Sequence, residues 1–454
     1  MSDRLYDDAM YRFDKPEQSY WEATKGQTSL EVQRLTANKV CDVAVIGAGY
    51  TGLSAAYHLC KEHDLDVHVL EAGHIGWGAS GRNGGFCSIG GHKLDDSVML
   101  KRYGLDVTRD YYKSQVEAVE LVRDLIVEEE IDSHMIGDGE IDVACSDKGF
   151  TQLRDHVDFQ SNELGLDAEL LTKEELSESY CDFPLQHGGS ILRPTFGLHP
   201  LQFIRGLARA ALKHGAEISI NSEVIEWVSD SRGHLLHTKE GTVRARNVVV
   251  ATNGFSPELL HSQLMGVTLP MISAIVVTRP LTNAELQAHQ WSTDCPTITA
   301  VNLMNYFRLL PDKRFLFGGR GSSDGSVEDA KRNYGKLISR FREVFPEWQG
   351  VDIDYQWHGL ICMTRRLTPA IGRFTGDPSV FFGFGYHGNG VNTATWSGQQ
   401  VARWLATGKE SSIAKPSWLP DVVYGMPQRF PFAALRLRYI AAQIAMMTIR
   451  DKLS

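Results

Sequence analysis

The chain has 454 residues, 43% of them apolar and 22% charged, which is the composition of an ordinary globular protein. This excludes an intrinsically disordered chain, a collagen and a small disulfide-stabilised protein, and the length allows two or three domains. The net charge is −10. Because neutralising phosphates takes clustered Lys and Arg, an acidic chain is a poor general nucleic-acid binder, and we expect no nucleic-acid partner.

The ends of the chain and its cysteines indicate where in the cell the protein is found. Residues 1–25 are polar and contain no apolar stretch typical of a secretory signal peptide, so we expect none. The seven cysteines are scattered, with no CxxC pair and no zinc-type spacing, which favours a cytoplasmic protein without a metal site. The uncharged stretch 439–449 is far shorter than the roughly 20 residues that span a membrane.

A strand–helix–strand unit follows a polar lead that contains the aromatic pair Tyr20-Trp21. The sequence VCDVAVI at 40–46 is a short apolar run rich in β-branched residues, which predicts a buried parallel strand. Apolar residues on one side predict a helix over 51–62, and DVHVL predicts the next strand at 66–70.

Further along the chain, the stretch 76–91 is a loop in which seven of sixteen positions are glycine. Alternating apolar and polar residues between 260 and 360 predict an antiparallel sheet. The remaining apolar patterns predict strands at 243–251 and 380–383 and helices at 106–130, 200–214, 327–345 and 392–407.

Strands whose sequences are typical of full burial therefore occur in three parts of the chain: at 40–70, at 243–251 and at 380–383. The block of alternating apolar and polar residues lies between the second and the third part. This order predicts an α/β fold class: a Rossmann-type dinucleotide domain built from discontinuous pieces, with an inserted domain of mixed or antiparallel sheet. We assign 39–100, 190–258 and 361–415 to the dinucleotide domain, 101–189 and 259–360 to the inserted substrate domain, 1–38 to an N-terminal lead and 416–454 to a C-terminal extension.

The sequence GAGYTG at 47–52 is a GxGxxG motif between a predicted strand and a predicted helix, which is where a dinucleotide fingerprint belongs. Gly47 permits the tight turn, Gly49 lets a pyrophosphate approach the backbone, and Gly52 lets the helix pack on the strand, so that the helix N-terminus faces the anion. Glu71, about 20 residues further on, is placed to bind ribose hydroxyls. A glycine turn in an unrelated α/β protein is the alternative.

A second glycine-rich turn, GFGYHG at 383–388, also follows a strand, but its helix does not lead into another strand. A second NAD-binding unit is therefore not expected. The free N–H groups at this helix N-terminus would suit the end of a flavin ring that gains negative charge on reduction. A plain strand-to-helix turn is the alternative.

Taken together, these segments resemble the D-amino-acid oxidase-like (DAO) FAD-dependent oxidoreductases, and within them the γ-glutamylputrescine oxidase group, over nearly the whole chain. The most specific match is WGASGRNGG, and the others are YFR, LFGG, TPAIG and GYHGNGV, at 77–85, 306–308, 316–319, 368–372 and 385–391. The resemblance implies a Rossmann-type FAD-binding domain and a mixed-sheet substrate domain.

The motif and the resemblance assign residues to the dinucleotide turn, the loop beside the flavin, the adenine and pyrophosphate contacts, and the turn by the pyrimidine ring. They are Gly47, Gly49, Tyr50, Thr51, Gly52, Glu71 and Ala72, then Trp77, Gly78, Ala79, Ser80, Arg82, Asn83, Gly84 and Gly85, then Val224, Ala251, Thr252 and Gly254, and finally Gly388, Asn389, Gly390 and Val391. Relatives often read Gly-Tyr-Ser-Gly-His-Gly-Val at the last turn. Here His387 and Asn389 replace the Ser and the His, so the resemblance does not define the amine.

The implied reaction is amine oxidation. A hydride leaves the C–H bond next to the nitrogen for the flavin, the imine hydrolyses, and dioxygen reoxidises the flavin with release of hydrogen peroxide. The amine must be neutral, which for an alkyl amine with a pKa near 10.4 costs about 4 kcal/mol at pH 7. An apolar, aromatic site lowers that cost because it disfavours the ammonium.

Two residues are candidates for this chemistry. His387, beside the late glycine turn, is suited to proton transfer, and a core or surface histidine is the alternative. Arg308, which has aromatic neighbours, is suited to bind a substrate carboxylate through two parallel hydrogen bonds, and a structural ion pair is the alternative. Trp77 and Trp357 are candidates for the pocket wall or for plain core.

Two further features have alternative readings. The pair Cys362-Met363 resembles the flavin-linking cysteine of sarcosine oxidase relatives, but its surroundings match them poorly, so we expect noncovalent FAD and an ordinary buried thiol. The aromatic, basic segment 430–453 suits a membrane or dimer surface, or a terminal helix packed on its own chain.

We therefore expect an FAD-dependent amine oxidase that acts on CH–NH or CH–NH2 groups, with a γ-glutamyl amine or an amino-acid-like amine and dioxygen as its small-molecule partners. We expect a monomer or a homodimer without a transmembrane segment. The alternatives are a dehydrogenase that passes electrons to a quinone or carrier, and a noncatalytic flavin-binding redox module.

Overall fold

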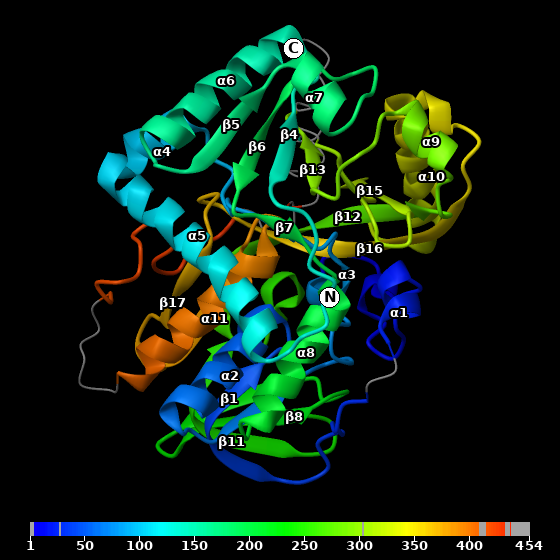
Figure 1. The fold of residues 1–454 in the computed structure, drawn as a ribbon. Helices are drawn as coiled ribbons and strands as arrows, with labels where there is room; N and C mark the ends of the chain where they lie inside the picture. Colours follow the sequence, from blue (N-terminus) through cyan, green and yellow to red (C-terminus); the bar gives the residue numbers. More distant parts are fainter. Residues whose placement is uncertain (1–3, 27–28, 302–303, 408–414, 432–435, 437–454) are drawn as a thin grey trace.

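The computed structural model describes residues 4–26, 29–301, 304–407, 415–431 and 436. Two eight-stranded sheets dominate the molecule, one in the lower and one in the upper half of the view in Figure 1, with helices packed on both. The α/β fold class predicted from the sequence is confirmed.

The first sheet is mostly parallel, as its short apolar strands predict. Neighbouring strands from β18 to β8 run parallel, while β17 is antiparallel to β18. The antiparallel hairpin of β9 (Glu226–Asp230) and β10 (Gly233–His237) pairs along β11. The strand order is β17 (Ala370–Phe374), β18 (Asp377–Phe384), β11 (Thr242–Val250), β1 (Lys39–Ile46), β2 (Val67–Leu70) and β8 (Glu217–Ser219).

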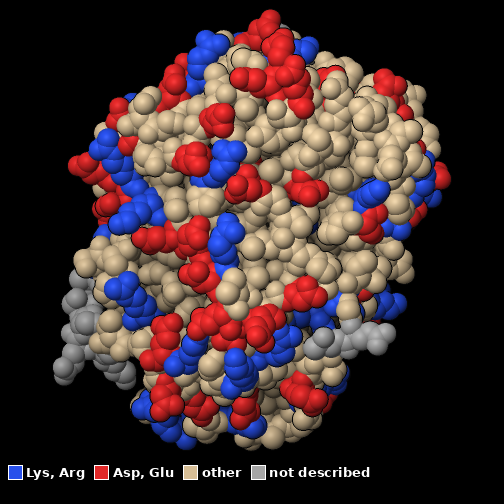
Figure 2. All heavy atoms as spheres, in the orientation of Figure 1, with Lys and Arg blue, Asp and Glu red and all other residues tan. Residues whose placement is uncertain are grey.

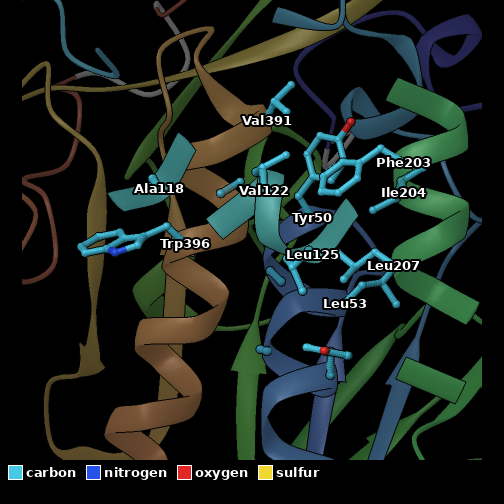
Figure 3. Packing of buried hydrophobic residues seen from close by; sticks show 14 of the residues in the cluster. Tyr50, Leu53, Ala118, Val122, Leu125, Phe203, Ile204, Leu207, Val391 and Trp396 are labelled. Atoms are coloured by element: carbon cyan, nitrogen blue, oxygen red, sulfur yellow. The ribbon is translucent and has the colours of Figure 1, made fainter. Parts of the chain in front are cut away.

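Four helices bury their apolar faces together beside this sheet, because each carries apolar residues at helical spacing. They are α2 (Tyr50–His63), α5 (Leu105–Glu128), α8 (Pro200–Lys213) and α11 (Gly390–Ala406). Figure 3 shows Leu53 of α2 facing Leu207 of α8, with Leu125 of α5 above them, and all three side chains are buried. The early and late glycine turns lie at the N-termini of α2 and α11, so this packing fixes the two turns relative to each other.

The second sheet is mixed. The antiparallel sheet predicted for 260–360 is confirmed from β16 to β13, but β13 pairs with β4 in parallel. Helix α10 (Val327–Val344) covers an aromatic cluster that includes Phe307, Phe317 and Phe341. The strand order is β16 (Ile353–Thr364), β12 (Thr268–Thr278), β15 (Phe315–Arg320), β14 (Tyr306–Leu309), β13 (Thr297–Thr299), β4 (Glu140–Val143), β6 (Gly189–Arg193) and β5 (Asp167–Leu171).

Three details differ from the sequence prediction. The stretch 76–91 is not loop throughout, because it holds the short helix α3 (Ala79–Arg82) and the strand β3 (Phe86–Cys87), which pairs with β7 (Phe196–Gly197). Strand β6 lies in the segment assigned to the dinucleotide domain but pairs in the second sheet, and β16 continues past residue 361. Local patterns do not reveal such long-range partners, and the division into domains stays a prediction.

The remaining helices lie at the edges of the two halves: α1 (Tyr20–Thr24), α4 (Asp96–Tyr103), α6 (Asp147–Asn162), α7 (Lys173–Ser179) and α9 (Asn283–Ala288). On the face in Figure 2, acidic and basic side chains are interspersed. Within the described residues, no helix combines the length and apolarity needed to cross a membrane. The segment 430–453 lies almost entirely outside the described residues, so its two readings stay open.

Candidate active site

A cavity of about 1700 Å³ opens between the two halves of the molecule. One wall runs from the N-terminus of α2 past α3 to the N-terminus of α11, and the opposite wall is formed by residues of β12, β14 and β16. Ligand pockets are typically about 300–1,000 Å³, so this cavity has room for an extended cofactor and a substrate together.

The early glycine turn has the geometry of a dinucleotide site. Gly47 has a φ of +103°, and a Cβ on it would lie 2.9 Å from the carbonyl oxygen of Ala251. A Cβ on Gly52 would lie only 1.9 Å from the carbonyl oxygen of Gly47. The N-cap of α2, Gly49, offers no side chain to the first N–H groups of the helix, so the helix end is left open toward an anion.

Two hydrogen bonds join this turn to the flavin loop and the late turn that the sequence predicted. The Ser80 hydroxyl accepts a bond of 3.1 Å from the Tyr50 N–H, which ties α3 to the start of α2. The hydroxyls of Thr51 and Tyr386 lie 2.6 Å apart, which ties α2 to the turn before α11. Segments far apart in the chain therefore meet around one cavity.

Glu71 stands at the end of β2, as the fingerprint requires. Its carboxylate accepts hydrogen bonds from the N–H groups of Ala48 (2.8 Å) and Gly73 (2.9 Å). Burial raises the pKa of Glu71, and these backbone N–H groups oppose the shift. An ionised carboxylate has about four acceptor positions, so Glu71 keeps capacity for ribose hydroxyls.

The loop around α3 is braced by its own side chains. The Arg82 Nε donates to the Trp77 carbonyl (2.6 Å), and its guanidinium bonds Glu17 (3.1 Å). Trp357 in β16 borders the cavity and donates its Nε1–H to the Arg82 carbonyl (2.8 Å). The Trp77 indole instead donates to the carbonyls of Arg12 and Lys15, so Trp77 holds the N-terminal lead and does not line the cavity.

Arg308 is fully buried beneath this loop. Its Nε donates to the Gly84 carbonyl (3.0 Å) and its Nη2 to the Leu198 carbonyl (2.6 Å). Burial lowers the pKa of Arg308 to about 10. The side chain does not border the cavity, and in this structure it holds the loop that carries Gly84, so carboxylate binding stays a prediction.

His387 borders the cavity, but both of its ring nitrogens are engaged by backbone groups. Nδ1 lies 3.1 Å from the Gly91 carbonyl oxygen, and Nε2 accepts a 3.1 Å bond from the Thr364 N–H. Burial, followed by the charge of Lys93, lowers the pKa of His387 to about 3. The imidazole is therefore neutral at pH 7 and holds the late turn against two neighbouring segments.

The late turn also presents a free helix end to the cavity. Asn389 is the N-cap of α11, makes no side-chain capping bond, and instead donates its Nδ2–H to the Ser88 carbonyl (2.8 Å). Gly388, Gly390 and Val391 line the cavity beside it.

The predicted cofactor residues divide into three groups. The cavity is bordered by Gly49, Tyr50, Thr51, Ala79, Ser80, Arg82, Asn83, Gly84, Ala251, Gly388, Asn389, Gly390 and Val391. Gly47, Gly52 and Gly85 shape the backbone behind it, and a Cβ on Gly85 would lie 2.0 Å from the Leu198 carbonyl oxygen. Glu71, Ala72, Trp77, Gly78, Val224, Thr252 and Gly254 are not among the residues that border the cavity.

Comparison with known families agrees with this geometry. Residues 42–404 match the family described as DAO, FAD dependent oxidoreductase. The chain belongs to this family. The two open helix ends and the glycines that permit no Cβ fit an FAD lying along the cavity.

The chain is also similar to individual proteins and solved structures. The chain is 30% identical over 433 residues to the γ-glutamylputrescine oxidoreductase of Escherichia coli, covering 92% of this chain and 95% of that protein. The solved structure of glycine oxidase from Geobacillus kaustophilus matches with a TM-score of 0.66 at 22% identity, over 83% of this chain and 96% of that one. L-proline dehydrogenase from P. horikoshii matches with a TM-score of 0.67 at 21% identity, over 82% and 95%. The two structures show the shared fold.

Sequence reasoning missed one group of cavity residues: Lys93, Glu140, Asp142 and His156. A signal was present, because EIDV at 140–143 alternates charged and apolar residues. Ile141 and Val143 are fully buried in the core of the second sheet, so the two carboxylates share the opposite face of β4.

Proposed function

We propose that the protein is an amine oxidase that holds FAD noncovalently and oxidises a γ-glutamyl amine or a related amino-acid-like amine. When bound, FAD supplies the two-electron acceptor for the C–H bond next to the nitrogen. Overall, an amine, dioxygen and water give an aldehyde, ammonia and hydrogen peroxide. The observation that carries the proposal is the single cavity that joins the dinucleotide turn, the flavin loop and the wall of the second sheet.

The wall of the second sheet supports an amine as the substrate. It presents Tyr306, Trp357 and Ile275, all of which border the cavity. The Tyr306 hydroxyl is engaged with Ser273 at 2.9 Å, and burial raises the pKa of Tyr306 to about 12, so this hydroxyl stays neutral. Such a wall favours the neutral form of the amine, which is the form that can lose a hydride.

The E. coli relative supports the γ-glutamyl part of the proposal, because the similarity covers nearly all of both chains. The hydrogen bonds of His387 and Arg308 favour positioning roles. His387 would hold the turn beside the pyrimidine ring, and Arg308 would hold the loop at Gly84.

Cys362 supports noncovalent binding. Its thiol borders the cavity, but burial raises the pKa of Cys362 to about 12, and a thiol with so little thiolate at pH 7 is a poor nucleophile.

The test is turnover in air. Purified protein loaded with FAD is mixed with γ-glutamyl amines, simple amines and free amino acids, and peroxide and aldehyde are measured. We expect equal amounts of peroxide and aldehyde from at least one amine. An aldehyde without peroxide would favour a dehydrogenase, and neither product from any amine would contradict the proposal. Acid precipitation of the protein should leave the flavin in solution, whereas a yellow pellet would indicate a covalent link.

A further inference from the structure

One region of the cavity holds charges that the reaction does not use. It is bordered by β4, α4 and α6, and it contains the side chains of Lys93, Glu140 and Asp142. We call these three residues the acid–base group. Beside it, the His156 Nδ1 and an Asp96 carboxylate oxygen lie 2.6 Å apart as a closed ion pair.

The acid–base group has few internal partners. Glu140 is bonded by the Ser88 hydroxyl. In the part of the chain that the structure describes, neither the Asp142 carboxylate nor the Lys93 ammonium has a hydrogen bond or ion pair. Glu140 and Asp142 are half-buried, whereas Lys93 borders the cavity but is exposed. A half-buried charge without a partner is costly unless something else satisfies it.

Burial dominates the behaviour of each member. It raises the pKa of Glu140 to about 8, helped by the neighbouring Asp142. It raises the pKa of Asp142 to about 6, against the charges of His156 and Lys93. It lowers the pKa of Lys93, against the two carboxylates. Within the described residues, no hydrogen bond or ion pair joins the three groups to one another, and all three border the cavity, so their opposite charges are available to a ligand there.

The region adjoins the flavin end of the cavity. Ser88, whose hydroxyl bonds Glu140, connects this region to the start of α11. Its backbone carbonyl accepts hydrogen bonds from the side chains of Asn389 (2.8 Å) and Asn392 (2.9 Å). A ligand in this region would therefore lie in the same cavity as the amine that reacts.

We infer that the acid–base group is a subsite for a zwitterionic α-amino-acid head group, with its ammonium on Asp142 and Glu140 and its carboxylate on Lys93. An ammonium alone would satisfy the Asp142 carboxylate and be repelled by Lys93, and a carboxylate alone would be repelled by Asp142. Only a ligand with both charges satisfies all three residues. This inference rests on the proposed function, because it gives the γ-glutamyl part of the substrate its binding site.

The experiment compares three substrates that carry the same reactive amine. They are the γ-glutamyl amine, the glutaryl amine, which lacks the head ammonium, and the 4-aminobutyryl amine, which lacks the carboxylate. For the FAD-loaded wild type, removal of either the ammonium or the carboxylate of the head group should lower kcat/KM by about tenfold or more. The change should be mainly a higher KM, because the charge-assisted hydrogen bonds that are lost lie away from the reacting carbon.

Two variants test which residue binds which charge of the head group. Asp142→Asn should abolish the preference for the γ-glutamyl over the glutaryl amine and keep the preference over the 4-aminobutyryl amine, and Lys93→Met should do the reverse. The exposed residues Lys101 and Asp110 provide the controls Lys101→Met and Asp110→Asn, which should change neither preference. Unchanged preferences in Asp142→Asn and Lys93→Met, or equal losses with all three substrates, would overturn the inference.

A binding measurement separates this inference from the proposed function. L-glutamine carries the head group but no reactive amine chain, so calorimetry with the FAD-loaded protein should show binding to the wild type and at least tenfold weaker binding to Asp142→Asn and Lys93→Met. Binding of glutamine without turnover of any amine would refute only the proposed function. Turnover with no glutamine binding and no head-group preference would refute only the subsite.

Discussion

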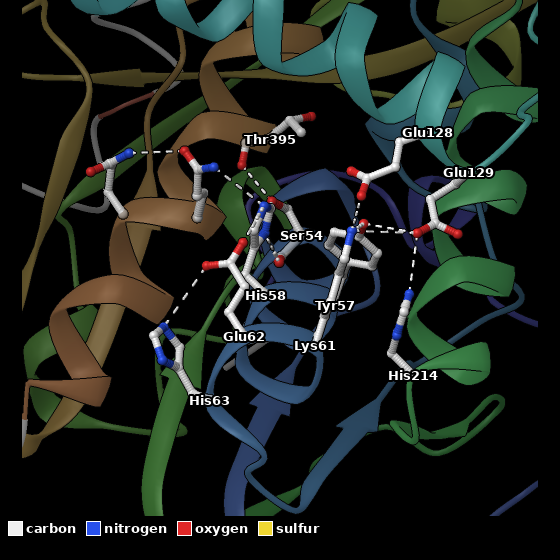
Figure 4. Close-up of polar contacts among 12 residues, drawn as sticks. Ser54, Tyr57, His58, Lys61, Glu62, His63, Glu128, Glu129, His214 and Thr395 are labelled. Carbon is white, nitrogen blue, oxygen red and sulfur yellow. Dashed lines mark hydrogen bonds and ion pairs between the residues drawn. The ribbon is translucent and has the colours of Figure 1, made fainter.

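Two groups of charged side chains in this protein behave in opposite ways. At the end of α5, the Glu129 carboxylate is 3% exposed and accepts bonds from Lys213 (2.9 Å), Tyr57 (2.9 Å) and His214 (3.2 Å), as Figure 4 shows in part. In the acid–base group of the cavity, Asp142 and Lys93 have no such partners among the described residues.

The contrast appears in the titration behaviour. Burial alone would raise the pKa of Glu129, but the bonds from Lys213, Tyr57 and His214 outweigh it and lower the pKa to about 2. In the cavity burial prevails, and the pKa of Glu140 rises to about 8. A charge whose partners all come from its own chain stabilises the fold. A charge left without partners beside a cavity is available to a ligand.

Arg308 extends the comparison, because it is a buried charge whose hydrogen bonds, within the described residues, all go to backbone carbonyls, and its guanidinium also lies over the Trp21 ring. We expect Arg308→Met to lower the free energy of unfolding by about 3 kcal/mol, since two buried carbonyls lose charged donors. FAD affinity should fall as well, because the Gly84 loop loses its support. Urea denaturation and FAD titration measure both effects, and Lys101→Met is the control. Unchanged FAD affinity would show that the loop does not need Arg308.

Glu129→Gln tests the partnered group. The change removes the charge that Lys213, Tyr57 and His214 share, and we expect a loss of about 1–2 kcal/mol in the free energy of unfolding. The neighbouring Glu128, whose side chain is 56% exposed, bonds Lys61 alone among the described residues, so Glu128→Gln should cost less than about 1 kcal/mol. Equal losses in the free energy of unfolding of the two variants would mean that burial of the Glu129 hydrogen bonds does not add to stability.

The pH dependence of stability should differ in sign between the two groups. The contribution of Glu129 is fully present above the unfolded Glu pKa of about 4.3 and is lost as the pH falls toward about 2, so Glu129→Gln should approach the wild type in acid. The raised pKa of Glu140 makes its ionised form unfavourable, so the wild type should lose stability relative to Glu140→Gln as the pH rises from about 4.3 to about 8. Denaturation curves at several pH values measure both trends, and trends of the same sign would contradict the comparison.

The smallest stability effect is expected in the cavity. Asp142→Asn removes an unpartnered charge, so without ligand the free energy of unfolding should stay within about 1 kcal/mol of the wild type or rise. L-glutamine should raise the melting temperature of the wild type but not of this variant. A large loss of stability in Asp142→Asn would show that its carboxylate has a structural role.

These regions also show how far the sequence could be interpreted. The GxGxxG turn and Glu71 were predictable, because a strand, a glycine turn and a helix follow one another directly in the chain. The hydrogen bonds of His387 and Arg308 were not predictable, because their partners Thr364, Gly84 and Leu198 come from distant segments.

The acid–base group required the same long-range information. Lys93 lies in a loop after the glycine-rich stretch, and Glu140 and Asp142 lie on a strand of the other sheet. Only the folded chain brings them to one cavity. The sequence shows that charged and apolar residues alternate along β4, but it does not show that the charged face of this strand borders a cavity.

The central claim is that the cavity between α2 and α11 holds FAD and delivers an amine to it. The most direct test is anaerobic mixing of the FAD-loaded protein with a γ-glutamyl amine while the visible flavin absorbance is followed. We expect the absorbance to fall with saturable dependence on the amine and to return when air is admitted. A protein that cannot be loaded with FAD, or whose flavin no amine bleaches, would contradict the account.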